Sequence, residues 1–66
     1  LNMVVNGETF KLQNPTTVKE FLTANGYDFS KVAVERNGDI IPKATFSETL
    51  LYDEDTIEVV RFVGGG

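Results

Sequence analysis

The 66-residue sequence predicts an α+β domain in which one main helix packs on one face of a mixed β-sheet. Two Asn-Gly dipeptides, at residues 6–7 and 37–38, each separate short apolar runs, which is the pattern of a tight β-hairpin. A single amphipathic helical segment lies between the hairpins, and the strand-like run TIEVVRF follows the second one. Because the strands do not alternate with helices, this order favours α+β over a βαβ fold.

The first hairpin is expected in NMVVNGETFKL and the helix in TTVKEFLTANG. Thr17 and Glu20 have the spacing of a capping box, and Gly26 is suited to the position just after the last turn. One helical face carries the apolar residues Val18, Phe21 and Leu22. A helix of two to three turns is marginal by itself, so this face should pack against the sheet.

The second hairpin is expected in KVAVERNGDII, where Pro42 limits the second arm to a short edge strand. The following stretch, KATFSETLLYDED, is expected to be irregular, with Asp53-Glu54-Asp55 as a solvated turn rather than a metal site, since no EF-hand glycine accompanies it. Its expected core residues are Phe46, Leu50 and Leu51. The first strand of the first hairpin should pair with the final strand in the centre of the sheet.

The final strand has two faces. Alternation places Ile57 and Val59 in the core beneath the helix, and it places Val60 and Phe62 on the open face beside Glu58. An exposed Phe at the end of a strand is often incidental. Next to the glycine-rich end of the chain, docking of a partner is the favoured interpretation, with Val60, Phe62 and Val63 as contacts.

Composition excludes several kinds of site. The sequence has no Cys and no His, which excludes disulfides, thiolate or imidazole metal sites and the usual nucleophiles and proton shuttles. The net charge is −4 and the basic residues are scattered along the sequence, which makes nucleic acid a poor partner and favours docking on a basic protein surface. No apolar run approaches the roughly 20 residues that span a bilayer, so we expect no membrane association and a cytoplasmic protein.

The whole chain resembles the ubiquitin-like β-grasp proteins, and more narrowly the ThiS-type sulfur carriers of thiamine biosynthesis. The resemblance rests on the first hairpin, on TTVKEFL, on VAVERNGDIIPK, on the acidic turn and above all on the terminal VVRFVGGG. It implies a β-grasp domain over residues 1–62 and a flexible glycine tail over residues 63–66. The family pattern ends in two glycines, and this chain has Gly64 before that pair.

The resemblance also implies a chemistry for the tail. A ThiF-like adenylating enzyme of the ubiquitin-activating type would use ATP to activate the Gly66 carboxylate, while Gly64 and Gly65 enter its active site. Sulfur from a cysteine-derived donor would convert the adenylate into a thiocarboxylate, which a ThiG-like thiazole synthase would consume. The chain would then be a co-substrate and not an enzyme, with no bound cofactor and no metal.

Two other interpretations remain open at this point. One is a molybdopterin-type sulfur carrier or another ubiquitin-like carrier, which would share the fold, the tail and the adenylation step. The other is a non-catalytic β-grasp interaction module whose terminal glycines are a passive tail. Conjugation of the tail to a protein lysine, as in ubiquitin, is a further variant.

Overall fold

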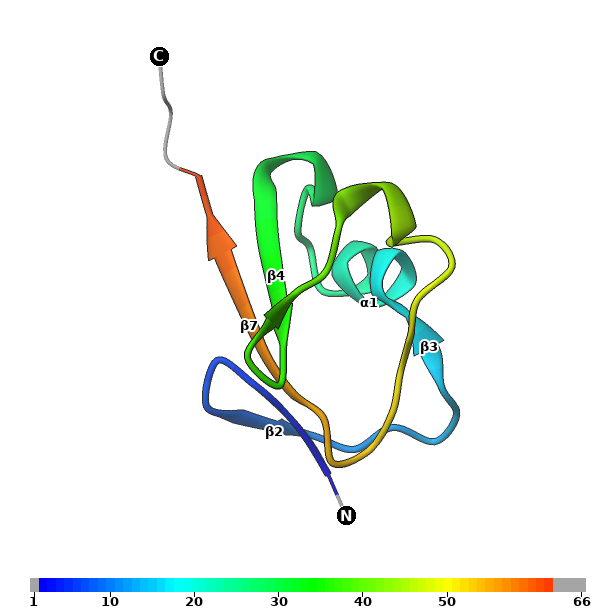
Figure 1. The fold of residues 1–66 in the computed structure, drawn as a ribbon. Helices are drawn as coiled ribbons and strands as arrows, with labels where there is room; N and C mark the ends of the chain where they lie inside the picture. The colour runs from blue at the N-terminus through cyan, green and yellow to red at the C-terminus, as the bar shows by residue number, and fades with distance from the viewer. Residues whose placement is uncertain (1, 63–66) are drawn as a thin grey trace.

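The predicted fold class is confirmed by the computed structural model, which describes residues 2–62. A five-stranded mixed sheet has the strand order β2-β1-β7-β4-β5, and helix α1 (Val18–Ala24) packs on one side of it (Figure 1). The strands are β1 (Met3–Val5), β2 (Glu8–Phe10), β4 (Val32–Arg36), β5 (Asp39–Ile40) and β7 (Thr56–Arg61). The β-grasp arrangement therefore consists of one main sheet that packs against one α-helix.

The last strand lies in the centre of this sheet. Strand β7 pairs in parallel with β1, where Val5 is opposite Ile57, and antiparallel with β4, where Val34 is opposite Val59. The expected pairing of the first strand with the final strand is thus confirmed. Strand β1 pairs with the first two residues of β7, Thr56 and Ile57, and β4 pairs with β7 from Ile57 to Arg61. The direction of β7 up to Arg61 is therefore set by its pairing within the sheet.

Both Asn-Gly dipeptides form the turns that the sequence predicts. Asn6 and Asn37 have φ angles of 49° and 51°, and Gly7 and Gly38 follow at 83° and 90°, the positive values of a tight hairpin turn. The two Asn side chains also bond β7. The Asn6 amide accepts from the Val59 N–H at 2.8 Å and donates to the Val59 carbonyl at 3.1 Å.

On the other side of β7, the side-chain oxygen of Asn37 accepts from the Thr56 N–H at 2.9 Å. The backbone N–H of Asn37 donates to the Thr56 carbonyl at 2.8 Å. Each turn therefore joins its hairpin to the central strand as well as reversing the chain.

Helix α1 has both of its ends capped. The Thr17 hydroxyl accepts from the Glu20 N–H and the Glu20 carboxylate accepts from the Thr17 N–H, each at 3.1 Å, which confirms the capping box. At the other end Gly26 has a φ of +81°, and the Tyr27 N–H donates to the Leu22 carbonyl at 2.9 Å, as in a Schellman motif. The helix is thus confirmed at its predicted position.

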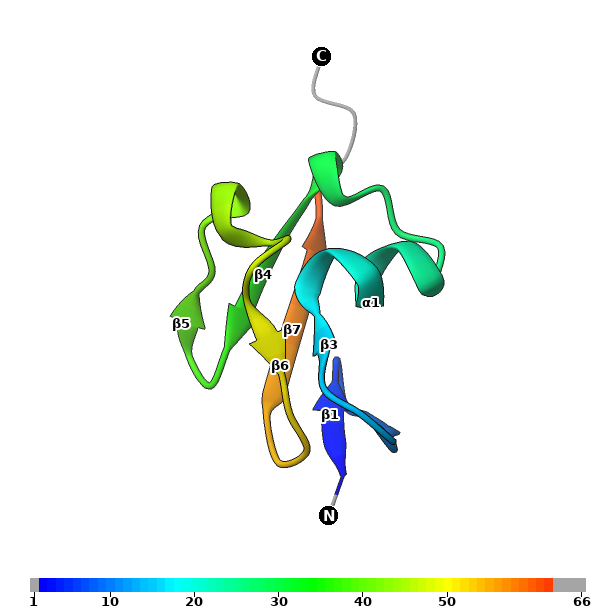
Figure 2. The same cartoon turned by 90° about the vertical axis from the view of Figure 1, so that its right-hand side faces the viewer.

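The region expected to be irregular has more structure than predicted. It contains the 3-10 helix η2 (Lys43–Thr45) and strand β6 (Leu50–Leu51), which pairs with β3 (Thr16–Thr17) in a small second sheet (Figure 2). The expectation that Leu50 fills the core is wrong: it is 39% exposed, whereas Leu51 is 1% exposed. Two neighbours in a strand point to opposite faces, so only one of them can be buried here.

The acidic turn is also less solvated than expected, because two of its carboxylates have partners within the chain. Asp55 accepts from the Tyr52 N–H at 3.0 Å and Asp53 accepts from the Leu12 N–H at 3.4 Å, and both residues are half-buried. Glu54 is exposed. The turn therefore stabilises the approach to β7 instead of only facing water.

One continuous apolar core lies between the sheet and α1. Its buried residues include the predicted Val18, Phe21, Leu22, Phe46, Leu51, Ile57 and Val59, together with Met3, Val5, Val32, Val34 and Ile41. No buried polar or charged residue occurs among residues 2–62. The core thus uses one face of β7 and leaves the other face to solvent.

Candidate functional site

The end of β7 carries the predicted site. The Phe62 N–H donates to the Lys31 carbonyl at 3.0 Å, so the backbone is anchored up to the last described residue. Val63, Gly64, Gly65 and Gly66, the predicted docking and reacting residues of the tail, lie outside the described residues. The structure therefore defines the surface around Phe62, the residue that precedes the tail in the sequence.

The two predicted docking residues that are described are both exposed. Val60 is 53% exposed and is opposite Ala33 on β4, and Phe62 is 61% exposed. The centroid of the Phe62 ring lies 5.6 Å from the Lys43 ammonium nitrogen. The predicted exposure is confirmed, and docking of a partner there stays a prediction.

The open face of the sheet contains one further apolar residue that the sequence analysis did not single out. Ile40 on β5 is 71% exposed and is opposite Glu35, which in turn is opposite Glu58 on β7. The register of the second hairpin could have revealed it, because a residue opposite Glu35 must share the face of Glu35. The open face therefore combines exposed aliphatic side chains with two carboxylates.

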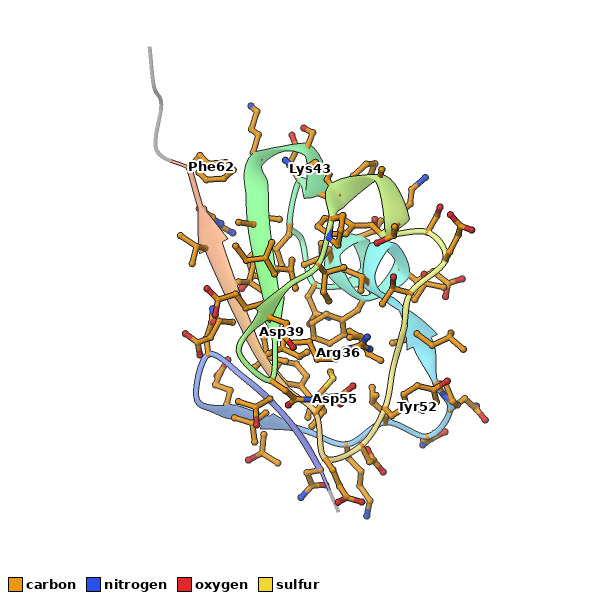
Figure 3. The ribbon with its side chains drawn as sticks, in the orientation of Figure 1. Arg36, Asp39, Lys43, Tyr52, Asp55 and Phe62 are labelled. Atoms are coloured by element: carbon orange, nitrogen blue, oxygen red, sulfur yellow. The ribbon has the colours of Figure 1, made fainter. Side chains whose placement is uncertain are left out.

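The expectation that the basic residues are scattered does not hold in three dimensions. Lys31, Lys43 and Arg61, here called the basic cluster, come together around Phe62: the Lys31 carbonyl binds the Phe62 N–H, Lys43 lies over the Phe62 ring, and Arg61 immediately precedes Phe62. All three residues are exposed. Figure 3 shows Lys43 and Phe62 at the same end of the molecule, away from Arg36, Asp55 and Tyr52.

Phe62 also borders an open hollow of about 300 Å³. The hollow is lined by Gly26, Asp28, Lys31, Val32, Arg61 and Phe62. Hydrogen bonds from the Ser30 hydroxyl and N–H, at 2.6 and 3.0 Å, together with nearby Lys31 and Lys43, hold the pKa of Asp28 below its ordinary value of 3.8. Asp28 is therefore ionised at neutral pH, and it is the one carboxylate among the residues that line the hollow.

The opposite end of the sheet has a different charge arrangement. Arg36 donates to the Leu50 carbonyl at 2.7 Å and lies 3.9 Å from the Asp55 carboxylate. This is the only ion pair within 4.0 Å in the described part of the chain. The positive charge of Arg36 is thus paired within the chain by the Leu50 carbonyl and the Asp55 carboxylate. The basic cluster around Phe62 has no carboxylate within 4.0 Å among residues 2–62.

The described residues offer little for metal binding or for a membrane. Between residues 2 and 62, no three acidic side chains are grouped so that they could hold a metal ion. Within the same range, no helix has the length and apolar character needed to cross a bilayer.

Comparison with known proteins places the chain in a family. A sequence model described as "ThiS family" matches residues 3–66. The sulfur carrier protein ThiS of Bacillus subtilis is 41% identical over 63 residues, covering 94% of this chain and 96% of that protein. The crystal structure of the thiamine biosynthesis protein ThiS from Geobacter metallireducens superposes with a TM-score of 0.81 at 32% identity, and both chains are covered completely.

A larger protein also contains a similar region. The thiazole synthase of Paramagnetospirillum magneticum is 41% identical over 66 residues, which is all of this chain but only 20% of that protein. The chain thus spans about one fifth of the length of this relative. The family match over residues 3–66, the relative of similar length and the shared β-grasp structure agree, and we conclude that the chain belongs to the ThiS family.

Proposed function

We propose that this chain carries sulfur on its own C-terminus, as a thiocarboxylate of Gly66, and donates it for formation of the thiazole ring of thiamine. The observation that carries the proposal is that the family match runs through the terminal glycines to residue 66. The relative from Bacillus subtilis, similar over nearly its full length, is a sulfur carrier protein. In this proposal the chain is a co-substrate of other enzymes and catalyses no reaction itself.

The chemistry follows from the weakness of a carboxylate as an acyl donor. A ThiF-like enzyme would let the Gly66 carboxylate attack the α-phosphorus of ATP, releasing pyrophosphate and leaving an acyl adenylate. A sulfur nucleophile derived from cysteine would then attack the carbonyl carbon and displace AMP. The chain itself holds no cofactor in this scheme, since ATP is bound by the partner.

The glycines supply access to a nucleotide inside an enzyme. Without a Cβ atom, Gly64 and Gly65 can adopt a wide range of φ angles and let the backbone pass through a narrow channel. Ordering each such residue opposes binding by about 1–2 kcal/mol. The folded domain must therefore contribute affinity through a docking surface, for which exposed Val60 and Phe62 are the candidates, continued by Val63.

The thiazole branch is favoured over the molybdopterin branch by the comparisons. A thiazole synthase contains a region similar to this whole chain, which supports a ThiG-like thiazole synthase as the enzyme that receives the sulfur. The proposal places the carrier in the cytoplasm, where ATP is available to the adenylating enzyme. Retention of a thiazole synthase, and not of a molybdopterin synthase, on the immobilised chain would support this branch.

The proposal is tested by intact-protein mass spectrometry. The chain is incubated with a ThiF-like enzyme, ATP and a cysteine-derived sulfur donor, and we expect the mass increase that accompanies exchange of one oxygen for sulfur. A variant that lacks Gly65 and Gly66, and so has no terminal glycine pair, should release no pyrophosphate and keep its mass. An unchanged mass of the full chain would indicate a passive tail, and a covalent adduct on a lysine would indicate protein conjugation.

A further inference from the structure

Two of the basic residues around Phe62, Arg61 and Lys43, contact aromatic rings and have no carboxylate within 4.0 Å among residues 2–62. Arg61 lies 5.0 Å from the Tyr27 ring centroid, and Lys43 lies 5.6 Å from that of Phe62. Lys19 is held in the same way, 5.0 Å from the centroid of Phe29. Three such contacts within residues 2–62 exceed the usual frequency of about one per 70–80 residues. An aromatic ring restrains a cation without neutralising its charge.

These contacts converge on one short segment. Tyr27 and Phe29 lie in or just before the 3-10 helix η1 (Phe29–Lys31), the Ser30 carbonyl accepts from the Lys43 ammonium at 2.9 Å, and the Lys31 carbonyl accepts from the Phe62 N–H. The segment thus fixes the basic cluster against the end of β7. The fold thus restrains the charges of Lys43 and Arg61, and it places the backbone of Lys31 beside Phe62.

The positive charge at this end contrasts with the whole molecule. The chain has ten acidic and six basic residues and a net charge of −4. The hollow beside Phe62 is nevertheless lined by two basic residues, Lys31 and Arg61, and by one carboxylate, Asp28, and the Lys43 ammonium lies over the Phe62 ring. None of the three cations lies within 4.0 Å of a carboxylate among residues 2–62. The molecule therefore carries positive charge at the end where Phe62 lies, and the tail follows Phe62 in the sequence. The rest of the molecule is acidic.

We propose that the basic cluster of Lys31, Lys43 and Arg61 docks on an acidic rim around the active-site entrance of the adenylating enzyme and orients the carrier with its tail first. This inference rests on the proposed function, and it adds that the partner's docking surface is negatively charged. Opposite charges on two approaching proteins increase their association rate and select one orientation. A basic partner surface, which the net charge alone would favour, would repel this end and turn the tail away.

A nucleic acid or an anionic membrane fits the cluster less well. Both present many phosphates over a wide area, so the acidic remainder of the chain would be repelled while only three cations are attracted. A local acidic rim, with side chains that reach the hollow between Lys31 and Arg61, matches the size of the cluster.

The test compares two substitutions that change the net charge equally. Lys31→Glu reverses a charge in the cluster, and no side-chain contact of Lys31 contributes to the fold in the described residues. Lys11→Glu reverses an exposed charge next to β2, at the Met3 end of the sheet. That position is about 20 Å from Phe62, given the rise per residue along β7. Far-UV circular dichroism and thermal unfolding verify that both variants are folded.

The measured quantity is kcat/KM for pyrophosphate release with the ThiF-like enzyme, as a function of ionic strength. We expect Lys31→Glu and Lys43→Glu each to lower kcat/KM about three- to tenfold at low salt, with the loss shrinking as salt screens the charges. Lys11→Glu should stay close to the unchanged chain. Lys43→Arg, which keeps the charge, should retain the unchanged rate.

The outcomes separate this inference from the proposed function. Equal kcat/KM for Lys31→Glu and Lys11→Glu, with full adenylation of the unchanged chain, would overturn the acidic rim and leave the sulfur carrier intact. Faster adenylation of Lys31→Glu would overturn it in favour of a basic partner surface. Binding of the unchanged chain to anionic phospholipid vesicles that Lys31→Glu abolishes, at an unchanged adenylation rate, would overturn it in favour of a membrane. No adenylation of the unchanged chain contradicts the proposed function instead.

Discussion

At the scale of single residues, Asn6 shows how one side chain can serve two purposes. It adopts the positive φ of the first turn, and its amide forms two hydrogen bonds with the backbone of Val59, in the middle of β7. The amide thus takes the place of the next residue of a parallel strand and extends the pairing between β1 and β7. Glycine would provide the same turn without these bonds.

We predict that Asn6→Gly lowers the free energy of unfolding by about 1–3 kcal/mol, since two hydrogen bonds are lost and the turn geometry is retained. Asn6→Asp keeps the acceptor and removes the donor, so its loss should be smaller. Urea unfolding of the three proteins measures this series. Equal stability of Asn6→Gly and the unchanged chain would mean that the amide contributes only to the turn.

Phe62 is a candidate docking residue because it directly precedes the tail in the sequence. Its ring is 61% exposed, and the residues that follow it are the tail. We predict that Phe62→Ala lowers kcat/KM for adenylation about tenfold, in the range of an aromatic docking residue, and leaves the fold intact. Tyr52→Ala is the matched control, because Tyr52 is 50% exposed at the opposite end (Figure 3). If the two variants have equal kinetics, Phe62 is not a docking residue.

At the scale of elements, strands β3 and β6 provide an internal comparison between neighbouring leucines. Leu51 is 1% exposed and Leu50 is 39% exposed. We predict that Leu51→Ala costs about 2–5 kcal/mol of stability, the range for a leucine removed from a core, and that Leu50→Ala costs less than about 1 kcal/mol. Chemical denaturation measures both. Similar losses for the two variants would contradict the burial of Leu51 and the exposure of Leu50.

Helix α1 gives a prediction about pH. The Thr17 N–H that donates to Glu20, supported by the Thr17 and Thr16 hydroxyls, lowers the pKa of Glu20 below its ordinary value of 4.5. A pKa that is lower in the folded state stabilises the fold above the ordinary value, and this stabilisation is lost as the pH falls through the folded value. We therefore predict that Tm falls between about pH 5 and pH 3 more steeply in the unchanged chain than in Glu20→Gln. Parallel curves would contradict a role for the ionised carboxylate in the cap.

The elements also mark the limit of what the sequence predicts. The turns, the helix cap and the central position of β7 depend on local signals, such as Asn-Gly and the Thr17–Glu20 spacing, and all were predicted. The two-residue strands β3 and β6 have no periodicity of their own and form only because distant segments meet. For the same reason the basic cluster could not be predicted: its members are 12 and 18 residues apart along the chain, as the numbers of Lys31, Lys43 and Arg61 show.

At the scale of the whole molecule, the proposed function gives the folded domain and the tail separate roles. The twelve apolar residues that are buried among residues 2–62 all lie between Met3 and Val59, so a chain that ends at Phe62 should fold. We predict that this shortened chain is not adenylated and inhibits adenylation of the full chain competitively, because it keeps the docking surface. Steady-state inhibition kinetics test this. The same chain with Phe62→Ala should inhibit less, and no inhibition at concentrations well above KM would place all of the affinity in the tail.

The central position of β7 has a consequence for synthesis on the ribosome. Chains emerge from the N-terminal end, and the strand that joins β1 to β4 is the last strand of this domain to be made. A nascent or prematurely terminated chain without β7 has two unconnected hairpins and cannot close the core over Ile57 and Val59. Folding of the domain is therefore completed only by β7, the strand that precedes the proposed reacting tail in the sequence. Under the proposed function, chains that stop before β7 would be unfolded and open to proteolysis, and they would not compete with the full chain for the adenylating enzyme.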